Sequence, residues 1–181
     1  MTREQLFDIL RPVIIGVTGV PECILADQSV TAPSGDYCSV EPFTNMKQLG
    51  RGNVKIEEVD PVDGNPNFKD QQSTLTSQVE TTVSVNFYRG AAMDYAHKLM
   101  FADQRFDVGD YLFKNGVGWM GCNNVNNLTM LNSGLYEPRS QIGIVVRFTH
   151  DQSSIVQQIY SASWEIENES GDIISSGGTE I

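Results

Sequence analysis

Long apolar runs and clusters of basic residues are both missing from this chain of 181 residues. No apolar stretch approaches the roughly 20 residues that a helix needs to cross a lipid bilayer. Arg3, Glu4 and Asp8 stand where a secretory signal would begin its apolar region, and no small-residue cleavage site follows them. We therefore expect neither a membrane-spanning helix nor a signal peptide.

Lysine and arginine are scarce, 12 residues against 23 aspartates and glutamates, which leaves a net charge of −11. They are scattered along the chain, whereas a protein that coats duplex DNA neutralises the phosphates with a basic patch. General DNA coating is therefore excluded. The excess of acid is compatible with two interpretations: a channel wall past which DNA slides without sticking, or simply a charged surface that maintains solubility.

Cysteine is also scarce. The chain contains three cysteines, Cys23, Cys38 and Cys122, and their spacing matches no metal site. This usage is typical of reduced, mostly buried thiols in a cytosolic chain. A disulfide between Cys23 and Cys38 is compatible with their spacing, although nothing in the sequence requires it.

Common catalytic patterns are absent: there is no Gly-x-Ser-x-Gly, no phosphate-binding loop and no His-Glu-x-x-His. Two histidines have an aspartate nearby, His97 with Asp94 and His150 with Asp151, and such a pair could act as an acid or a base. A surface histidine is the simpler interpretation of each.

Two groups of carboxylates could in principle hold a cation through their oxygens, but they lack the spacing of a calcium loop. These are Glu57, Glu58, Asp60 and Asp63 in one group, and Asp103, Asp107 and Asp110 in the other. We interpret both as solvated surfaces. The sequence therefore predicts no enzyme, no metal and no cofactor.

Strand patterns are what the sequence does contain. Residues 79–88 alternate over ten positions, and further strands are expected at 22–27, 37–41, 53–60, 135–149 and 155–167. The apolar faces of the three longest are Val79, Thr81, Val83, Val85 and Phe87; Ile142, Ile144, Val146 and Phe148; and Tyr160, Ala162, Trp164 and Ile166. We expect a connector at 42–52, a long loop or an extended hairpin tip at 60–77, a twisted or bulged strand at 119–130 and a turn at 150–154.

Helical patterns occur in two places. Residues 2–18 carry an apolar stripe at helical spacing, with Thr2 and Gln5 resembling a capping box and Pro12 expected to kink or split the helix. Residues 91–103 form the second pattern, and one or two further turns are expected at 106–114.

The order of these elements predicts an α+β fold. We expect a mainly antiparallel, twisted sheet flanked by the N-terminal helix and one central helix. Residues 1–168 are expected to form a single domain, and residues 169–181 a flexible C-terminal tail.

Four residues are candidates for contacts between subunits. Glu137 and Arg139 flank a proline at the start of a strand, on the same face. They could pair with each other, for about 0–1 kcal/mol, or reach a neighbouring subunit, where a bidentate arginine contact helps to fix the register. Tyr88 and Arg89, at the end of the 79–88 strand, complete the set.

Four motifs in order resemble those of tail terminator proteins, which belong to the neck of tailed bacteriophages. Residues 10–21 read Leu-Arg-Pro-Val-Ile-Ile-Gly-Val-Thr-Gly-Val-Pro, and an Asp-Gln pair at 27–28 precedes Pro-Ser-Gly-Asp-Tyr at 33–37. Residues 83–92 read Val-Ser-Val-Asn-Phe-Tyr-Arg-Gly-Ala-Ala, and Tyr-Glu-Pro-Arg-Ser follows at 136–140. With the two closing strands, the resemblance extends from residue 10 to about residue 167.

The resemblance implies a structural virion protein, made in the host cytoplasm, whose subunits form a hexameric ring. Such a ring caps the tail tube, ends its polymerisation and joins the tail to the head-side connector, while DNA passes through the lumen. It also contacts the sheath in phages with contractile tails. No catalytic residue carries over.

Two other hypotheses remain at this point. One is a related virion part, such as a head-completion adaptor or a minor tail protein. The other is an enzyme that uses Asp94 and His97, or the acids at 57–63.

Overall fold

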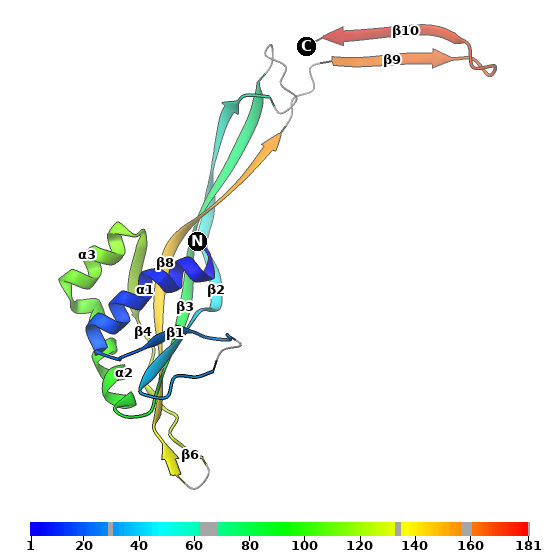
Figure 1. Ribbon diagram of the computed structural model, residues 1–181. Coiled ribbons are helices and arrows are strands. Elements are labelled where there is room, and N and C mark those ends of the chain that lie inside the picture. Colours follow the sequence, from blue (N-terminus) through cyan, green and yellow to red (C-terminus); the bar gives the residue numbers. More distant parts are fainter. Residues whose placement is uncertain (29–30, 62–68, 133–134, 157–160, 181) are drawn as a thin grey trace. The chain divides into compact units, whose positions relative to one another are not determined.

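The computed structural model describes residues 1–28, 31–61, 69–132, 135–156 and 161–180 (Figure 1). Two compact units divide the chain. The first contains residues 1–51 and 77–150, and the second contains residues 52–76 and 151–181. The described residues contain three α-helices, all in the first unit, and none of them is long and apolar enough to cross a membrane.

Helix α1 (Arg3–Thr18) begins at the predicted capping box. The Thr2 hydroxyl accepts a hydrogen bond from the Gln5 backbone N–H at 3.2 Å, and the Gln5 side chain accepts one from the Thr2 N–H at 2.8 Å. Gly19 ends the helix with a φ of 77°, in the left-handed region that favours glycine. Pro12 lies inside α1 without splitting it.

The central helical region is divided into three pieces. Helix α2 (Ala92–Met100) and a short 3₁₀-helix (Ala102–Gln104) occupy the predicted helix at 91–103. Helix α3 (Phe106–Lys114) is a complete helix at the place where one or two turns were expected.

The main sheet has the strand order β1-β2-β3-β8-β4, with β5 also paired to β8. The strands are β1 (Cys23–Leu25), β2 (Tyr37–Val59), β3 (Asp70–Tyr88), β4 (Val117–Cys122), β5 (Asn126–Asn127) and β8 (Arg139–Val156). Strand β1 is parallel to β2, whereas β4 and β5 are antiparallel to β8. Together with the helices, this sheet confirms the α+β prediction.

Three predicted connections are strand in the structure. Residues 42–52 lie within β2, residues 150–154 lie within β8, and β3 already begins at Asp70 inside the predicted loop at 60–77, of which 62–68 lie outside the described residues. Glycine and polar residues suggested turns there. Gly50, with a φ of 68°, is nevertheless accommodated inside β2. Pairing with neighbouring strands satisfies the backbone and overrides these local signals.

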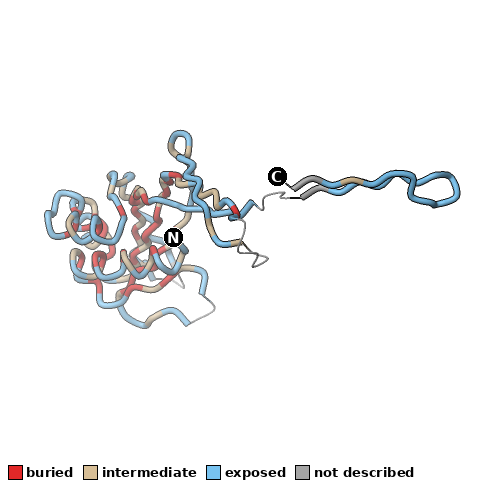
Figure 2. Tube along the Cα trace, turned by 90° about the horizontal axis from the view of Figure 1, so that it is seen from above, coloured by how far each residue is buried: buried red, intermediate tan, exposed pale blue. Residues whose placement is uncertain are grey.

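The core lies between the helices and one face of the sheet. Val83, Val85 and Phe87 of β3 belong to it, and so do the predicted residues Ile142 to Phe148 of β8 at every second position. Figure 2 shows the buried positions in red. All three helices contribute to the same core. The residues buried there include Leu6, Leu10 and Ile14 of α1, Leu99 of α2 and Leu112 of α3. The period-two patterns are thus confirmed in the first unit.

Two small antiparallel sheets complete the described structure. Strands β6 (Met130–Asn132) and β7 (Leu135–Glu137) form a hairpin in the first unit. Strands β9 (Ser161–Glu167) and β10 (Ile173–Glu180) form one in the second unit, where the Trp164 ring lies over Gly177. The predicted strand at 155–167 is therefore divided, because Ile155 belongs to β8 and Tyr160 lies outside the described residues. Strand β10 occupies much of residues 169–181, which were expected to form a flexible tail. The division into a domain at 1–168 and a tail at 169–181 stays a prediction.

Candidate subunit-contact site

The four predicted contact residues lie together at one end of the sheet. Tyr88 is the last residue of β3, Arg89 follows it, Glu137 ends β7 and Arg139 begins β8. The Arg89 N–H donates to the carbonyl of Pro138 at 2.8 Å, which holds the end of β3 against the start of β8. Residues that are about 50 positions apart in the sequence therefore form one cluster.

Two stacked tyrosines form the centre of this cluster. The rings of Tyr37 and Tyr88 are 4.6 Å apart at their centroids and only 8° from parallel. The Arg89 guanidinium lies 5.6 Å from the Tyr37 centroid, and the Arg139 guanidinium lies 5.0 Å from the Tyr88 centroid. Each ring thus has a cation within the distance at which the ring quadrupole attracts it. Burial raises the pKa of Tyr37.

Arg89 connects three segments of the chain. Its guanidinium donates to the carbonyls of Pro33 and, at 3.1 Å, of Gly35, and its Nε lies 3.4 Å from a carboxylate oxygen of Glu137. Its backbone has a φ of 65°, which is rare outside glycine. The contacts of the side chain offset this conformational cost and hold the loop before β2 in place.

Arg139 faces the other side of the cluster. Its Nη2 donates to the Asn86 side-chain oxygen at 3.2 Å. Its Nε is buried and has no hydrogen-bond partner among the described residues, and its guanidinium lies over the Tyr88 ring. Arginine is suited to this position because its planar cation stacks on a ring and donates at its edge at the same time.

A cavity of about 480 Å³ opens beside the cluster, on the face of the sheet opposite the core. Tyr37, Ser84, Asn86, Tyr88 and Arg139 are among the residues that line it. Beside the charged Arg139, the lining near the cluster consists of hydroxyl and amide groups, which suit hydrogen bonding more than the chemistry of a nucleophile.

Glu41, which also lines this cavity, forms an ion pair with Arg3. Arg3 donates to both carboxylate oxygens of Glu41, at 3.2 and 2.6 Å, and to the carbonyl of Ala26 at 2.7 Å. These hydrogen bonds from Arg3 hold the pKa of Glu41 below its usual range. The pair links the first turn of α1 to β2.

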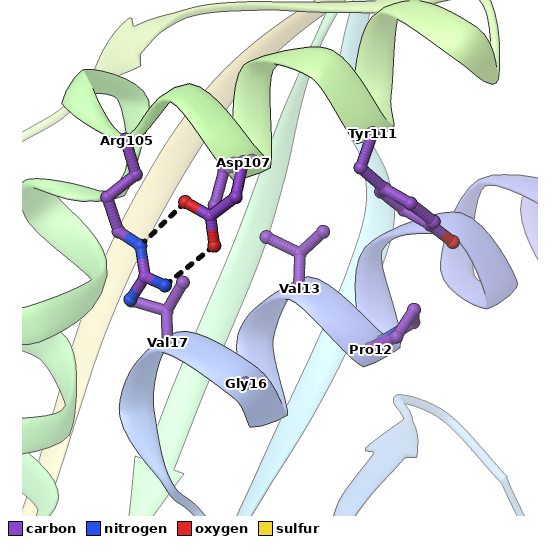
Figure 3. Close-up of a pocket in the computed structure, with 8 residues that line it drawn as sticks. Pro12, Val13, Gly16, Val17, Arg105, Asp107 and Tyr111 are labelled. Carbon is purple, nitrogen blue, oxygen red and sulfur yellow. Dashed lines mark hydrogen bonds and ion pairs between the residues drawn. The ribbon is translucent and has the colours of Figure 1, made fainter.

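A second cavity, of about 250 Å³, separates α1 from α3 (Figure 3). Val13, Gly16 and Val17 line it from α1, and Tyr111 lines it from α3. Nothing lies within 4 Å of the place that a side chain at Gly16 would occupy, so the missing side chain keeps the groove open. Arg105 and Asp107, at the start of α3, also line the cavity and form an ion pair through two hydrogen bonds, at 3.1 and 2.7 Å.

His97 and Asp94, which the enzyme hypothesis pairs, are both exposed on α2. In the second group of carboxylates, Asp107 and Asp110 are paired with Arg105 and Lys114. No group of three potential metal ligands occurs among the described residues, which do not include Asp63.

The cysteines are not activated either. Cys23 and Cys38 are buried register partners on β1 and β2, both as free thiols, and their mutual hydrogen bond together with burial raises the pKa of Cys38. Burial raises the pKa of Cys122 to about 11. A thiol that stays protonated at neutral pH is a poor nucleophile.

The contact prediction did not include Tyr37 or the loop carbonyls of Pro33 and Gly35, which also belong to the cluster. The only signal in the sequence was the Pro-Ser-Gly-Asp-Tyr turn at 33–37, which indicated a turn but no partner. Its partner Arg89 is 54 residues from Gly35, so tertiary structure alone brings them together.

One protein-family model, described as phage neck terminator protein, matches residues 4–172, which is most of the chain. None of the curated proteins compared with the chain matches it. The match includes all four motifs of the resemblance, both helical regions and the Tyr88–Arg139 cluster. The chain therefore belongs to the family of phage neck terminator proteins, and it is a structural protein of the bacteriophage virion.

Proposed function

We propose that this protein forms a ring of six subunits that caps the tail tube, ends its polymerisation and joins the tail to the head-side connector. DNA passes through the lumen, and in a phage with a contractile tail the ring also contacts the sheath. The family match over residues 4–172 carries this proposal.

The described surface supports assembly. Large apolar side chains are exposed on α3, on the β6–β7 hairpin and on the β9–β10 hairpin, as expected for a subunit whose contacts are made with other chains. A closed ring needs two different surfaces on each subunit, joined head to tail. The net charge of −11 suits a lumen that does not retain DNA.

Tyr88, Arg89, Glu137 and Arg139 remain our candidates for subunit contacts. The side chains of Arg89 and Glu137 are 36% and 31% exposed, so the cluster keeps a surface that a neighbour can reach. We propose that the stack fixes the end of β3 and the start of β8 in the shape that the neighbouring subunit recognises. Arg139→Ala should then weaken assembly more than it weakens the fold, and Arg139→Lys should restore the charge without the stacking.

Electron microscopy of the purified protein, with and without tail tubes and with light scattering for mass, tests the proposal. Six-membered rings, or a single layer at one end of each tube, are the expected result. A monomer that ignores tube ends would contradict it. Binding to the head-side connector alone would instead favour a head-completion adaptor.

A further inference from the structure

The most exposed apolar side chains of the first unit lie on two separate elements. Among the described residues, four large apolar side chains are more than three-quarters exposed: Phe106 (89%), Phe113 (82%), Tyr136 (78%) and Leu135 (77%). The two phenylalanines belong to α3, and the other two belong to β7 of the β6–β7 hairpin. Exposure of this degree is unfavourable for a free subunit and marks surfaces that meet another protein.

The phenylalanines form a ridge along α3. Phe106 and Phe113 are seven residues apart, which places them on the same side of the helix. Val108 and Leu112 are buried on the opposite side. We call Phe106 and Phe113 the α3 ridge. The groove between α1 and α3 runs along the flank of the same helix (Figure 3).

The β6–β7 hairpin has exposed apolar side chains on both of its faces, and Glu137, the register partner of Met130, is the charged residue of one face. Leu131 and Tyr136 are register partners and therefore share one face, whereas Leu135 is on the other face with Met130. Leu131 and Met130 are also more than half exposed. A two-stranded hairpin with apolar side chains exposed on both faces is marginal in water and is stabilised when a partner covers it.

Both surfaces are electrically neutral in a strongly acidic chain. Residues 115–136, which include the whole of β6 and Leu135 and Tyr136 of β7, contain no charged residue, and Glu137 at the end of β7 pairs with Arg89 at 3.4 Å. On α3, Lys114 pairs with Asp110 at 2.7 Å, and Asp107 pairs with Arg105. Two copies with a net charge of −11 each can therefore meet at these surfaces without local repulsion, and without burying an unpaired charge.

This neutrality favours a second copy as the partner. A basic partner would be attracted to the acidic parts of the chain, such as residues 151–181, which contain six acidic residues and no lysine or arginine. Figure 1 shows the hairpin beyond the end of the sheet, next to the start of β8, and α3 in the helical layer. Because the two surfaces are in different places on one unit, their contact joins copies head to tail, which is the geometry that closes a ring.

We propose that the β6–β7 hairpin of one subunit packs against the α3 ridge of the next subunit. This contact rests on the proposed ring and names the surfaces that hold it together. Each subunit uses its hairpin on one neighbour and its α3 ridge on the other, so six identical contacts complete the ring.

Two single variants test the contact, Leu135→Asp in the hairpin and Phe113→Asp in the ridge. Each puts a charge into an apolar contact and should weaken assembly at least about 30-fold, as removal of an interface hot spot does. Both side chains are exposed, so the thermal midpoint and the circular dichroism spectrum should stay those of the wild type. Ile174→Asp, at a position that is 66% exposed in the second unit, is the matched control and should assemble normally.

Mixing the two variants gives the sharpest result. Leu135→Asp keeps an intact ridge and Phe113→Asp keeps an intact hairpin, so one functional contact remains between them. The mixture should form 1:1 dimers by light scattering, although neither variant associates alone. Wild-type protein should form rings, with tail tubes added as a template if it does not do so alone.

The outcomes separate this inference from the ring proposal. If the wild type forms rings and both variants do so equally well, the contact is wrong and the ring stands. If the variants form rings but no longer cap tubes, the tail tube covers these surfaces, which also overturns the inference. A wild type that never forms rings, even on tubes, contradicts both.

Discussion

At the scale of single residues, two arginines make contacts that a lysine could not make. Arg89 and Arg139 each combine a cation over a tyrosine ring with directed hydrogen bonds, to the Gly35 carbonyl in one case and to Asn86 in the other. A lysine would keep the charge but lose the planar stacking and the second donor. The resulting cluster stabilises the end of β3 on the face of the sheet away from the apolar core.

Tyr88→Ala should destabilise the protein by about 1–3 kcal/mol, because it removes both the stack on Tyr37 and the ring beneath Arg139. Tyr88→Phe keeps the ring and should cost less than about 0.5 kcal/mol. Urea unfolding of the two variants measures the difference. Equal losses for both would show that the hydroxyl, and not the ring, is the stabilising group.

Gly90→Ala should destabilise the protein by roughly 1–3 kcal/mol. Gly90 has a φ of 41°, and an added Cβ would lie 1.9 Å from a carboxylate oxygen of Asp36, which accepts a hydrogen bond from Tyr95. The variant must therefore displace Asp36 and strain the backbone. Gly35→Ala is the control, since nothing lies within 4 Å of its added Cβ; a loss as large there would contradict this explanation.

At the scale of elements, the long strands are joined by polar contacts on the face away from the core. Glu80 of β3 bridges its two neighbours, with Lys47 of β2 at 2.6 Å and Arg147 of β8 at 2.8 Å. On the core side of the sheet, the buried Thr81 of β3 adds a hydrogen bond to the carbonyl of Asn45 at 2.6 Å. Such contacts fix the register of strands whose local sequence does not specify it.

Glu80→Gln should lower the melting temperature at pH 7. Lys47 and then Arg147 hold the pKa of Glu80 below its usual range, so its ionised form stabilises the folded state. That stabilisation is complete above the ordinary glutamate pKa of about 4.3 and is lost as the pH falls through the lower, folded-state pKa. The melting temperatures of wild type and variant should therefore converge in acid. Glu169→Gln, at an exposed position, should show no difference at either pH.

At the scale of the whole molecule, the net charge of −11 opposes the proposed assembly of identical subunits. Subunits of equal charge repel one another over the Debye length, which falls from about 30 Å at 0.01 M salt to about 8 Å at 0.15 M. Neutral surfaces on α3 and β6–β7 reduce this repulsion locally, but the rest of each subunit still contributes to it.

Assembly should therefore become stronger as salt is raised from about 0.01 M to 0.15 M, since screening removes repulsion and leaves apolar contacts intact. Light-scattering mass against sodium chloride concentration measures this. Assembly that weakens with salt would mean that ion pairs between subunits dominate the contact.

Much of the fold could be predicted from local patterns. The capping box of α1, the alternation of Val83, Val85 and Phe87, and the inward face of β8 all depend on neighbours within a few positions, and all are confirmed. The connectors at 42–52 and 150–154 could not be predicted, because Gly50 and the polar residues favour turns locally while strand pairing extends β2 and β8 through them.

The sequence by itself determined the α+β class, the core faces, the acidic charge and, through its ordered motifs, the phage neck terminator family. These properties are carried by spacing and composition, which a chain possesses before it folds. Only the tertiary structure decided that Tyr37 stacks on Tyr88, that Arg89 binds the loop at 33–35, and that α3 and the β6–β7 hairpin expose apolar surfaces. Contacts between residues far apart in the chain, and the faces left uncovered by them, depend on how the elements pack together.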